Sequence, residues 1–352
     1  MDPQSTTATL HERSGADMVL SVIVPARNEA DCITKCLESL ARQSDDGFDF
    51  VLGKDWELIV VDDGSSDSTR ALAEQIPGVQ VLAAPAPAAG WTGKANACWT
   101  GAKSARGAWL LFTDADTVHE DGDLRRALHE AERTGAKLLS YSPRQIVAGF
   151  WQHALMPLIF SDLARAYPPL MVSNPQSAIA AANGQFLMVE RGPYQRAGGH
   201  AAVAKSLLED VAIARNVKRI APIRFRYAPD AVSTHMYRNF GAMVEGWTKN
   251  LALLFPSPLL LALYRFLDFA LLLGLPVLAS RLYSTPQKLL VLLWWVWRLG
   301  LYLARVGKSN FPMGDCVLSI AALPVYSALL VRSWMLHRIT KRVAWKGRTY
   351  GA

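Results

Sequence analysis

Apolar and amphipathic stretches alternate regularly over roughly the first third of the chain. Four short stretches are apolar, rich in β-branched residues and closed by proline or polar loops, as is typical of buried strands; they cover residues 19–25, 56–61, 79–83 and 109–113. Helical spacing of apolar residues between them predicts three helices, at 33–40, 69–76 and 96–104. This alternation predicts a parallel sheet with right-handed crossovers, a Rossmann-like half suited to a nucleotide.

The pattern is less regular after residue 116. We expect an amphipathic helix over 124–133, a strand over 137–142, and a turn at 183–185 that leads into a strand at 186–189. The stretch 149–166 is apolar and aromatic, but polar residues interrupt it too often for a membrane span. It predicts either a lipid-facing groove or an ordinary core helix.

Three apolar segments follow, at about 251–279, 289–306 and 316–336. The first is long enough to cross a bilayer, although prolines and the pair Arg265 and Asp268 interrupt it. Those two charges are spaced i, i+3, so they can neutralise each other on one helix face. The second segment is short and rich in tryptophan, which suits an interface or a tilted span. The third segment is the clearest candidate for a membrane span.

Composition agrees with a membrane protein. The mean hydropathy is +0.13 and 51% of the residues are hydrophobic, both high for a soluble protein. The formal net charge is +7, and part of it lies in a basic tail at 337–352. A basic cluster beside an apolar segment suits an anionic lipid surface. The polar part has no basic patch interleaved with aromatics, so we do not expect nucleic-acid binding.

The predicted organisation has four parts: a disordered N-terminus at 1–17, an α/β domain at 18–250, membrane helices at 251–336 and a cytoplasmic tail at 337–352. The N-terminus lacks an apolar signal region, so the domain should be cytoplasmic. Three complete spans would then put the basic tail outside, against the positive-inside rule. We therefore expect one segment to be re-entrant or interfacial, with part of the first as the leading candidate. The four cysteines have no zinc-site spacing and are expected to be reduced, buried thiols.

The strongest chemical signal is the stretch 110–117, where an apolar strand ends in Asp114 and Asp116. Side chains two residues apart in an extended or tightly turned backbone point the same way. The two carboxylates can therefore converge on a hard divalent cation, with diphosphate oxygens completing its coordination shell. Such a pair at the carboxyl end of a strand also lies where open α/β sheets bind ligands. By itself, however, Asp-x-Asp is also typical of a solvated turn.

Five motifs occur in order along the chain: VIVPARNEA at 22–30, VVDDGSSDST at 60–69, GWTGKANA at 90–97, FTDADT at 112–117 and LLEDVAIA at 207–214. Together they resemble a family 2 glycosyltransferase with the nucleotide-sugar-binding GT-A fold, over about residues 18–250. The loop GWTGK, the residues GQF at 184–186 and the tail WKGR at 345–348 resemble membrane-anchored bacterial enzymes of carotenoid and hopanoid lipid pathways. The resemblance implies a mixed, mainly parallel sheet, a nucleotide-sugar donor and C-terminal hydrophobic helices.

The resemblance also implies roles for individual residues. The residues implied for donor binding are Pro25, Arg27, Glu29, Asp63, Lys94 and Asp114. Asp114 and Asp116 would hold Mg²⁺ or Mn²⁺, and Lys94 would approach the diphosphate. Without the resemblance, Lys94 is equally well interpreted as a solvated loop lysine.

Asp210 is the candidate catalytic base, which would take a proton from an acceptor hydroxyl in a single inverting displacement. The alternative for a Glu-Asp pair at a helix start is a favourable interaction with the helix dipole. Candidate contacts to the acceptor or the diphosphate are Glu209, Gln185, Arg238, Trp247 and Lys249. The Gln-x-x-Arg-Trp motif of polymerising family members is absent, which favours single transfer over processive synthesis.

We therefore expect an inverting, metal-dependent transfer of one hexose, from a UDP-linked donor, to a lipid or membrane-bound hydroxyl. The enzyme would be a multi-pass inner-membrane protein. A polyprenyl-phosphate hexosyl- or mannosyltransferase is the alternative within the enzyme class. A catalytically silent membrane scaffold is the alternative outside it, although both aspartates and the candidate base are present. A nucleotidyltransferase would normally have a glycine-rich phosphate loop after the first strand, where this chain has Ala-Arg-Asn-Glu.

Overall fold

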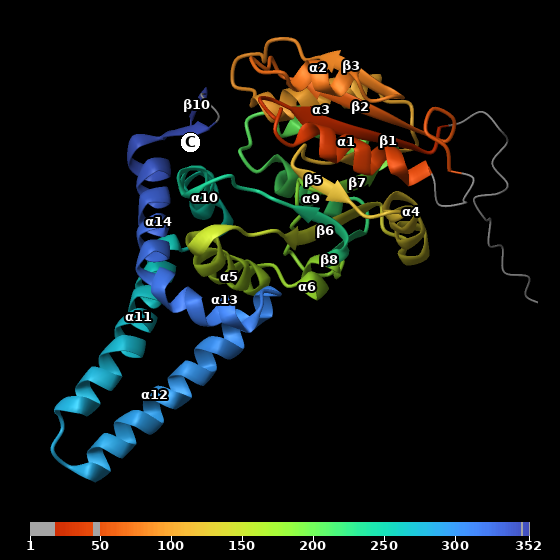
Figure 1. Cartoon of the computed structure of the whole chain (residues 1–352). Helices are drawn as coiled ribbons and strands as arrows, with labels where there is room; N and C mark the ends of the chain where they lie inside the picture. The colour runs from red at the N-terminus through yellow and green to blue at the C-terminus, as the bar shows by residue number, and fades with distance from the viewer. Residues whose placement is uncertain (1–17, 45–49, 346–347, 352) are drawn as a thin grey trace, which may run out of the picture. The chain divides into compact units, whose positions relative to one another are not determined.

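The computed structural model describes residues 18–44, 50–345 and 348–351, and Figure 1 traces the chain. The described residues form two compact units. Unit 1 contains the chain up to Arg144 together with Ala181–Thr234, and unit 2 contains Gln145–Ala180 and the chain from His235 onward. The N-terminus at 1–17, predicted to be disordered, lies outside the described residues. The domain boundaries predicted from the sequence stay a prediction.

Unit 1 is built on an eight-stranded mixed sheet with the order β3-β2-β1-β4-β7-β6-β8-β5. Its strands are β1 (Leu20–Ala26), β2 (Trp56–Asp62), β3 (Val79–Ala83), β4 (Trp109–Phe112), β5 (Thr117–His119), β6 (Leu138–Gln145), β7 (Leu187–Glu190) and β8 (Ile223–Thr234). The first four are parallel, whereas β7 is antiparallel to both β4 and β6, and β5 is antiparallel to β8. The mixed sheet predicted from the sequence is confirmed.

The register of the parallel strands brings their carboxyl ends together. Ile23 of β1 pairs with Ile59 of β2 on one side and with Phe112 of β4 on the other. The loops that follow β1, β2 and β4 therefore leave the sheet along the same edge, where ligands of open α/β sheets bind.

Helices pack on both faces of this part of the sheet. The helices of unit 1 are α1 (Ile33–Ala41), α2 (Thr69–Glu74), α3 (Gly93–Ser104), α4 (Asp123–Thr134), α7 (Arg191–Arg196), α8 (Gly199–Ala202) and α9 (Glu209–Lys218). Val22 and Val24 share one buried core with Leu37 of α1, whereas Ile23 points to the opposite face. There α3 approaches so closely that a Cβ at Gly101 would lie 2.5 Å from Ile23 Cγ2. A glycine is needed at this contact because any larger residue would push α3 off the sheet.

The strands and helices predicted in the regular part of the sequence are confirmed, with small differences at their ends. Helix α3 begins at Gly93 rather than at residue 96, because Thr92 caps it by accepting a hydrogen bond from the Ala95 amide. Two strands of unit 1 were not predicted. β5 is only three residues long, and β8 contains a proline and several charged residues that obscure the period-two pattern.

Unit 2 is helical. Its helices are α5 (Gly149–Ala166), α6 (Pro169–Ser173), α10 (Phe240–Leu254), α11 (Pro258–Arg281), α12 (Thr285–Val306), α13 (Met313–Leu318) and α14 (Leu323–Met335), and strands β9 (Arg342–Trp345) and β10 (Arg348–Gly351) form a terminal hairpin. The segment 149–166 is a core helix, since its residues 154–156 and 158–160 pack in one buried cluster with Trp247, Tyr302 and Tyr326. Of the two interpretations offered by the sequence, the core helix is therefore correct.

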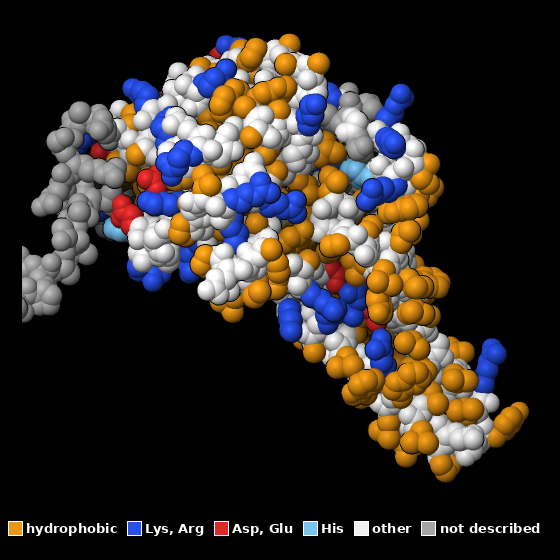
Figure 2. Space-filling view, turned by 180° about the vertical axis from the view of Figure 1, so that it is seen from behind, with side chains coloured by type: hydrophobic (Ala, Val, Ile, Leu, Met, Phe, Trp, Pro, Cys, Tyr) orange, Lys and Arg blue, Asp and Glu red, His pale blue; other side chains and the backbone are white. Residues whose placement is uncertain are grey.

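Three helical stretches are long and apolar enough to cross a membrane: Pro258–Arg281, Thr285–Ser309 and Met313–Thr340. They differ in how much of their surface is buried by the rest of the protein. α11 and α12 form a long antiparallel hairpin (Figure 1), and much of its surface is exposed apolar side chains (Figure 2). The third stretch is the most buried of the three, at 44%, and α14 packs against α10 as well as α11.

Candidate active site

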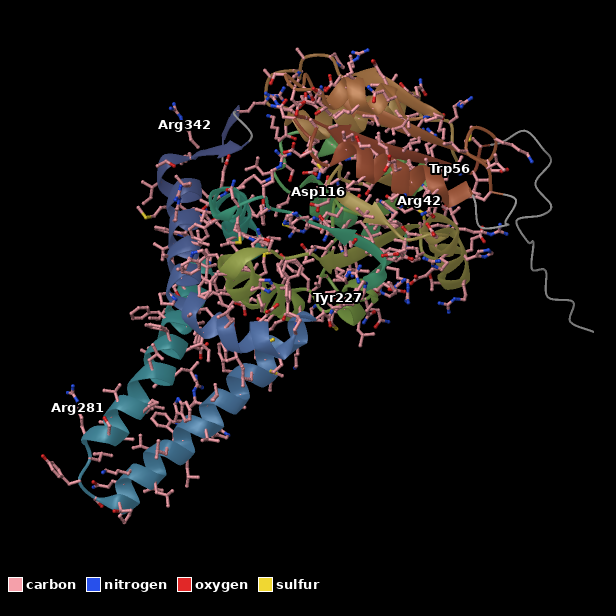
Figure 3. All side chains as sticks on the ribbon, viewed as in Figure 1. Arg42, Trp56, Asp116, Tyr227, Arg281 and Arg342 are labelled. Atoms are coloured by element: carbon pink, nitrogen blue, oxygen red, sulfur yellow. The ribbon has the colours of Figure 1, made fainter. Side chains whose placement is uncertain are left out.

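The two aspartates of the Asp-x-Asp stretch lie in the turn between β4 and β5, at the edge where the parallel strands end. Both side chains are half-buried, and Figure 3 shows Asp116 beside β5. The Asp114 carbonyl oxygen accepts a hydrogen bond from Thr117 Oγ1 at 2.7 Å, which closes the turn. This turn thus holds two carboxylates at the carboxyl end of a central strand, as the sequence predicts.

Lys94, the second residue of α3, lies against this turn. Its Nζ is 2.7 Å from Asp114 Oδ1 and 3.0 Å from Glu209 Oε1 at the start of α9. Three motifs far apart in the sequence therefore meet at one ammonium group. The arrangement excludes the interpretation of Lys94 as a solvated loop lysine.

Asp210 lies on the other side of the loop that contains Gly184. Its Oδ2 accepts a hydrogen bond from the Gly184 amide at 2.8 Å, and its Oδ1 accepts one from the Val211 amide at 2.7 Å. A Cβ at Gly184 would lie 2.8 Å from Lys94 Nζ and 3.5 Å from Asp210 Oδ2. A larger residue at this position would require the Lys94 ammonium group to shift.

Burial and nearby charges determine the pKa values of Asp210 and Lys94. Loss of hydration, reinforced by the charge of Glu209, raises the pKa of Asp210 to about 6, although Lys94 opposes the shift. Burial on its own would lower the pKa of Lys94, but Asp114, Glu209 and Asp210 raise it well above its usual value. At neutral pH the site therefore combines a permanent ammonium with a carboxyl group that can gain or lose a proton.

The loops after β1 and β2 are hydrogen-bonded to each other beside this site. The Asn28 amide donates to Ser65 Oγ, and the Glu29 amide donates to Thr69 Oγ1. Asp62 orders its own turn by accepting a hydrogen bond from the Ser65 amide at 3.1 Å. The two loops are thus fixed relative to each other.

Arg27 and Asp63 face each other across these loops, with 3.9 Å between Arg27 Nη1 and Asp63 Oδ2. Arg27 Nε is buried and has no hydrogen-bond partner among the residues that the structure describes. A buried guanidinium donor that lacks a partner is costly unless a ligand satisfies it. Glu29 lies in the same loop and accepts a weak hydrogen bond from Cys32 Sγ.

The remaining candidates are placed differently. The Gln185 side chain is 3% exposed and donates to Thr234 Oγ1, so its amide is engaged inside unit 1. Trp247, Arg238 and Lys249 belong to unit 2. Trp247 is buried against Phe160 and Tyr237, whereas Arg238 is exposed. The roles proposed for these four residues toward an acceptor or a diphosphate stay predictions.

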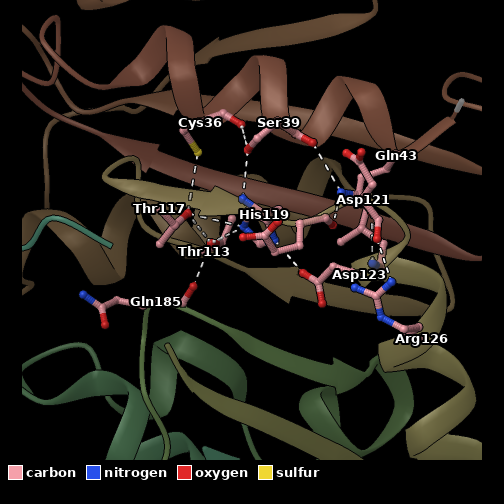
Figure 4. Close-up of polar contacts among 12 residues, drawn as sticks. Cys36, Ser39, Gln43, Thr113, Thr117, His119, Asp121, Asp123, Arg126 and Gln185 are labelled. Carbon is pink, nitrogen blue, oxygen red and sulfur yellow. Dashed lines mark hydrogen bonds and ion pairs between the residues drawn. The ribbon is translucent and has the colours of Figure 1, made fainter. Parts of the chain in front are cut away.

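A buried polar network behind the Asp-x-Asp turn was not found from the sequence (Figure 4). Thr113 Oγ1 donates to the Gln185 carbonyl oxygen at 2.8 Å and lies 3.1 Å from His119 Nε2. His119 Nδ1 lies 2.8 Å from Asp123 Oδ2 at the start of α4. The network joins the turn after β4 to the loop before β7. Its only sequence signal was a cluster of polar residues directly after a strand, which is equally typical of a solvated loop.

A second histidine that the sequence did not point to lies in a small cavity beside Lys94. The cavity is lined by Pro25, Lys94, Cys98, Phe112, His200 and Asp210, among others. Burial lowers the pKa of His200 to about 3, so its imidazole is neutral at pH 7. Its Nδ1 lies 2.8 Å from the Tyr194 hydroxyl, which fixes the ring.

The residues at the turn fit a divalent cation that a substrate helps to hold. Within the described ranges, no three His, Cys, Asp or Glu side chains are grouped to hold an ion by themselves. Mg²⁺, however, is usually held by one or two carboxylates together with substrate phosphates, and carboxylate oxygens also suit Mn²⁺. Asp114 and Asp116 provide this oxygen set. Lys94 already contacts Asp114 Oδ1, so the lysine and a cation would share that carboxylate.

The fold is that of a known class of proteins, the GT-A glycosyltransferases. A solved structure of that class is similar over nearly the whole chain: the mannosyltransferase PcManGT from Pyrobaculum calidifontis, in complex with GDP-Man and Mn²⁺. The TM-score is 0.52, the identity is 18%, and the match covers 93% of this chain and 88% of that one. At this identity the likeness shows the fold alone, and it confirms the predicted GT-A fold.

Residues 21–192 match the family described as Glycosyl transferase family 2, so the chain contains a glycosyltransferase domain of that family. A Staphylococcus haemolyticus protein named 4,4'-diaponeurosporenoate glycosyltransferase is 30% identical over 241 residues, which cover 66% of this chain and 61% of the relative. A Staphylococcus aureus (strain MRSA252) protein of the same name is 27% identical over 344 residues, which cover 94% of this chain and 88% of the relative. The predicted family, and its resemblance to carotenoid-associated members, are confirmed.

Proposed function

We propose that the protein transfers a single hexose, with inversion, from a nucleotide sugar to a membrane lipid. The observation that carries the proposal is the contact of Lys94 with both Asp114 and Glu209, with Asp210 across Gly184. One site thus contains the ammonium group of Lys94, the turn that carries the Asp114 carboxylate, and the titratable carboxyl group of Asp210. The relatives' names support an acceptor of the carotenoid-related class.

The donor would bind at the carboxyl ends of β1, β2 and β4. Asp114 and Asp116 would hold Mn²⁺ or Mg²⁺, which would neutralise the nucleoside diphosphate as it leaves. Lys94 would contact the same diphosphate as a point charge. Arg27 and Asp63 would bind the nucleoside, with Arg27 Nε gaining the partner that it lacks. A UDP-linked donor is proposed from the family resemblance.

Asp210 would act as the general base. It would take the proton of an acceptor hydroxyl as that oxygen attacks the anomeric carbon. Both of its oxygens accept a backbone hydrogen bond, and a carboxylate oxygen has a second lone pair for the incoming proton. An acceptor that presents a carboxylate would arrive without that proton, and Asp210 would then matter less.

For localisation we propose an inner-membrane protein with its catalytic unit in the cytoplasm. The α11–α12 hairpin would enter the bilayer and return, while α14 would stay packed against α10. An even number of crossings keeps the basic tail in the cytoplasm, as the positive-inside rule requires. The third apolar segment thus becomes the better candidate for the non-spanning one. Cysteine labelling of the tail in sealed inside-out and right-side-out vesicles tests this, and a tail labelled from outside would overturn it.

The activity test is donor hydrolysis by the purified, detergent-solubilised protein across UDP- and GDP-sugars, with and without Mn²⁺. We expect metal-dependent release of one nucleotide, reduced about 10³-fold in Asp116→Ala, because a bound metal supplies several kcal/mol of charge stabilisation. Asp121→Ala is the matched control, since Asp121 is exposed and lies five residues further along the chain.

If hydrolysis requires an acceptor, the same screen is repeated with carotenoid-derived and polyprenyl-phosphate lipids. Transfer to a polyprenyl phosphate alone would identify the protein as the alternative enzyme, a polyprenyl-phosphate hexosyl- or mannosyltransferase. Failure to bind any donor, with or without Mn²⁺, would favour a silent scaffold over an enzyme.

A further inference from the structure

Unit 2 contains a buried network of charged side chains that links three helices. Arg265 of α11 donates from Nε and Nη2 to the two oxygens of Asp162 in α5, at 3.0 and 2.5 Å. Its Nη1 donates to Asp268 Oδ2 at 2.7 Å, so the pairing predicted at this i, i+3 spacing is confirmed. Asp268 also accepts from Arg298 Nη2 at 2.9 Å and from Arg305 Nη2 at 2.8 Å, both in α12.

The network has more positive than negative charge. Three arginines face two aspartates, and every carboxylate oxygen is already used: both of Asp162 by Arg265, and both of Asp268 by the three arginines. A net charge among apolar helices is costly unless an ion of opposite sign compensates it. One positive charge therefore lacks a counter-ion within the network.

The uncompensated charge has an identifiable location. The Nε atoms of Arg298 and Arg305 are buried and have no hydrogen-bond partner among the described residues. These two side chains are also the most exposed of the network, at 28% and 24%, whereas Arg265 is 4% exposed. The same two arginines, seven residues apart on α12, therefore have both the unpartnered donors and the most exposed side chains of the network.

We propose that Arg298 and Arg305 bind the phosphate group of an anionic membrane lipid. Two guanidinium groups match the several oxygens of a phosphate, and basic pockets between membrane helices are suited to lipid headgroups. Trp297 and Leu301 lie beside them on α12 and are 58% and 47% exposed, so they can contact the lipid chains. Figure 2 shows basic and acidic side chains together at the end of the hairpin far from its turn, whereas apolar side chains predominate along the rest.

The test is a titration of the full-length protein in a neutral detergent with phosphatidylglycerol, phosphatidylcholine or inorganic phosphate, followed by thermal unfolding. We expect a saturable stabilisation by phosphatidylglycerol only. Arg298→Gln should weaken the apparent affinity for that lipid about fivefold, since each basic residue near an anionic headgroup contributes on this scale. It leaves two arginines against two aspartates, so the neutral network should still fold.

Arg281→Gln is the matched control, because it makes the same charge change at the turn of the same hairpin, where Arg281 is exposed (Figure 3). Arg298→Lys keeps the charge and should keep most of the lipid response, which covers the case in which the glutamine variant does not fold. An equal loss in Arg281→Gln would overturn the proposal in favour of general surface charge. Equal stabilisation by inorganic phosphate would overturn the lipid as the source of the phosphate.

Discussion

The two units each hold a compact group of charged side chains, but the groups have opposite imbalance. In unit 1, one lysine faces three carboxylates, those of Asp114, Glu209 and Asp210. In unit 2, three arginines face two aspartates. A group with excess negative charge can take up a cation, and a group with excess positive charge can take up an anion. The sign of the imbalance therefore indicates the kind of ligand better than the number of ion pairs does.

Asp210→Asn should have the largest effect, because it removes the proposed base from unit 1 with little change in shape. We expect transfer to a hydroxyl acceptor to fall about 10³-fold, within the range typical of general bases. Donor affinity should change little, because Asp210 faces the acceptor in the proposed arrangement. Single-turnover transfer and equilibrium donor binding measure the two quantities separately. Loss of donor binding with unchanged transfer per bound donor would assign Asp210 a structural role.

Arg265→Met tests the network of unit 2 in the same way. It leaves Asp162 buried without its partner, and breaking a buried pair typically costs 3–5 kcal/mol, so we expect destabilisation of about that size. Thermal unfolding in detergent measures it, with Arg281→Met at the exposed turn as the control. Equal stability of the two variants would mean that the network does not form.

The pH dependence of the reaction sharpens the contrast, because the group in unit 1 contains a carboxyl group, that of Asp210, whose pKa is raised toward neutrality. Asp210 must be ionised to act as a base, and its pKa is raised to about 6. We therefore expect kcat/KM to fall about tenfold per pH unit below about 6. A profile that is flat from pH 5 to 8 would contradict the assignment.

The effect of the same group on stability has the opposite sign. A raised pKa means that the folded protein binds the proton more tightly than the unfolded chain does. Asp210 therefore favours folding at low pH, and this contribution is lost as the pH rises through about 6. If activity increases as the pH rises through this range, the increase cannot result from a stabilising effect of Asp210 on the fold. Thermal unfolding at the same pH values separates the two.

The smallest expected effects come from two matched helix caps, one in each unit. Thr92 Oγ1 accepts from the Ala95 amide at the start of α3, and Asn239 Oδ1 accepts from the Ala242 amide at the start of α10. Each alanine substitution should cost about 1 kcal/mol. Only Thr92→Ala should also weaken donor binding, because Lys94 is in the first turn of α3. Denaturant unfolding and donor titration of both variants measure this difference.

The two groups also differ in how far the sequence could predict them. In unit 1, Asp114 stands at the end of a strand, where open α/β sheets bind ligands, and Lys94 and Asp210 stand in motifs whose resemblance to family 2 glycosyltransferases implied their roles. In unit 2 only the Arg265–Asp268 pair could be predicted, because it is local. Asp162 is 103 positions away from Arg265 in the chain, and no periodic pattern links them.

The local sequence pattern also failed to predict strands that form only because they pair with another strand. β5 forms because it pairs with β8, and neither has the alternation of a half-buried strand. His119 could not be recognised as part of a network before β5 and α4 placed it beside Thr113 and Asp123. Tertiary contacts, rather than local propensity, decide such elements.

The distribution of charge between α11 and α12 has a consequence for biosynthesis. In α11, Arg265 has an acidic partner in Asp268, and the second basic residue, Arg281, lies at the turn of the hairpin, so the apolar stretch between its ends can enter the bilayer without net charge. α12 carries Lys288, Arg298 and Arg305 and no acidic residue, so alone it would bring unpaired positive charge into the apolar phase. Synthesis from the N-terminus delivers Asp268 before either arginine, which allows α12 to insert against a helix that already offers a counter-charge. We therefore expect Asp268→Asn to impair insertion of the second helix while sparing the first, as glycosylation-site mapping of the nascent hairpin would reveal.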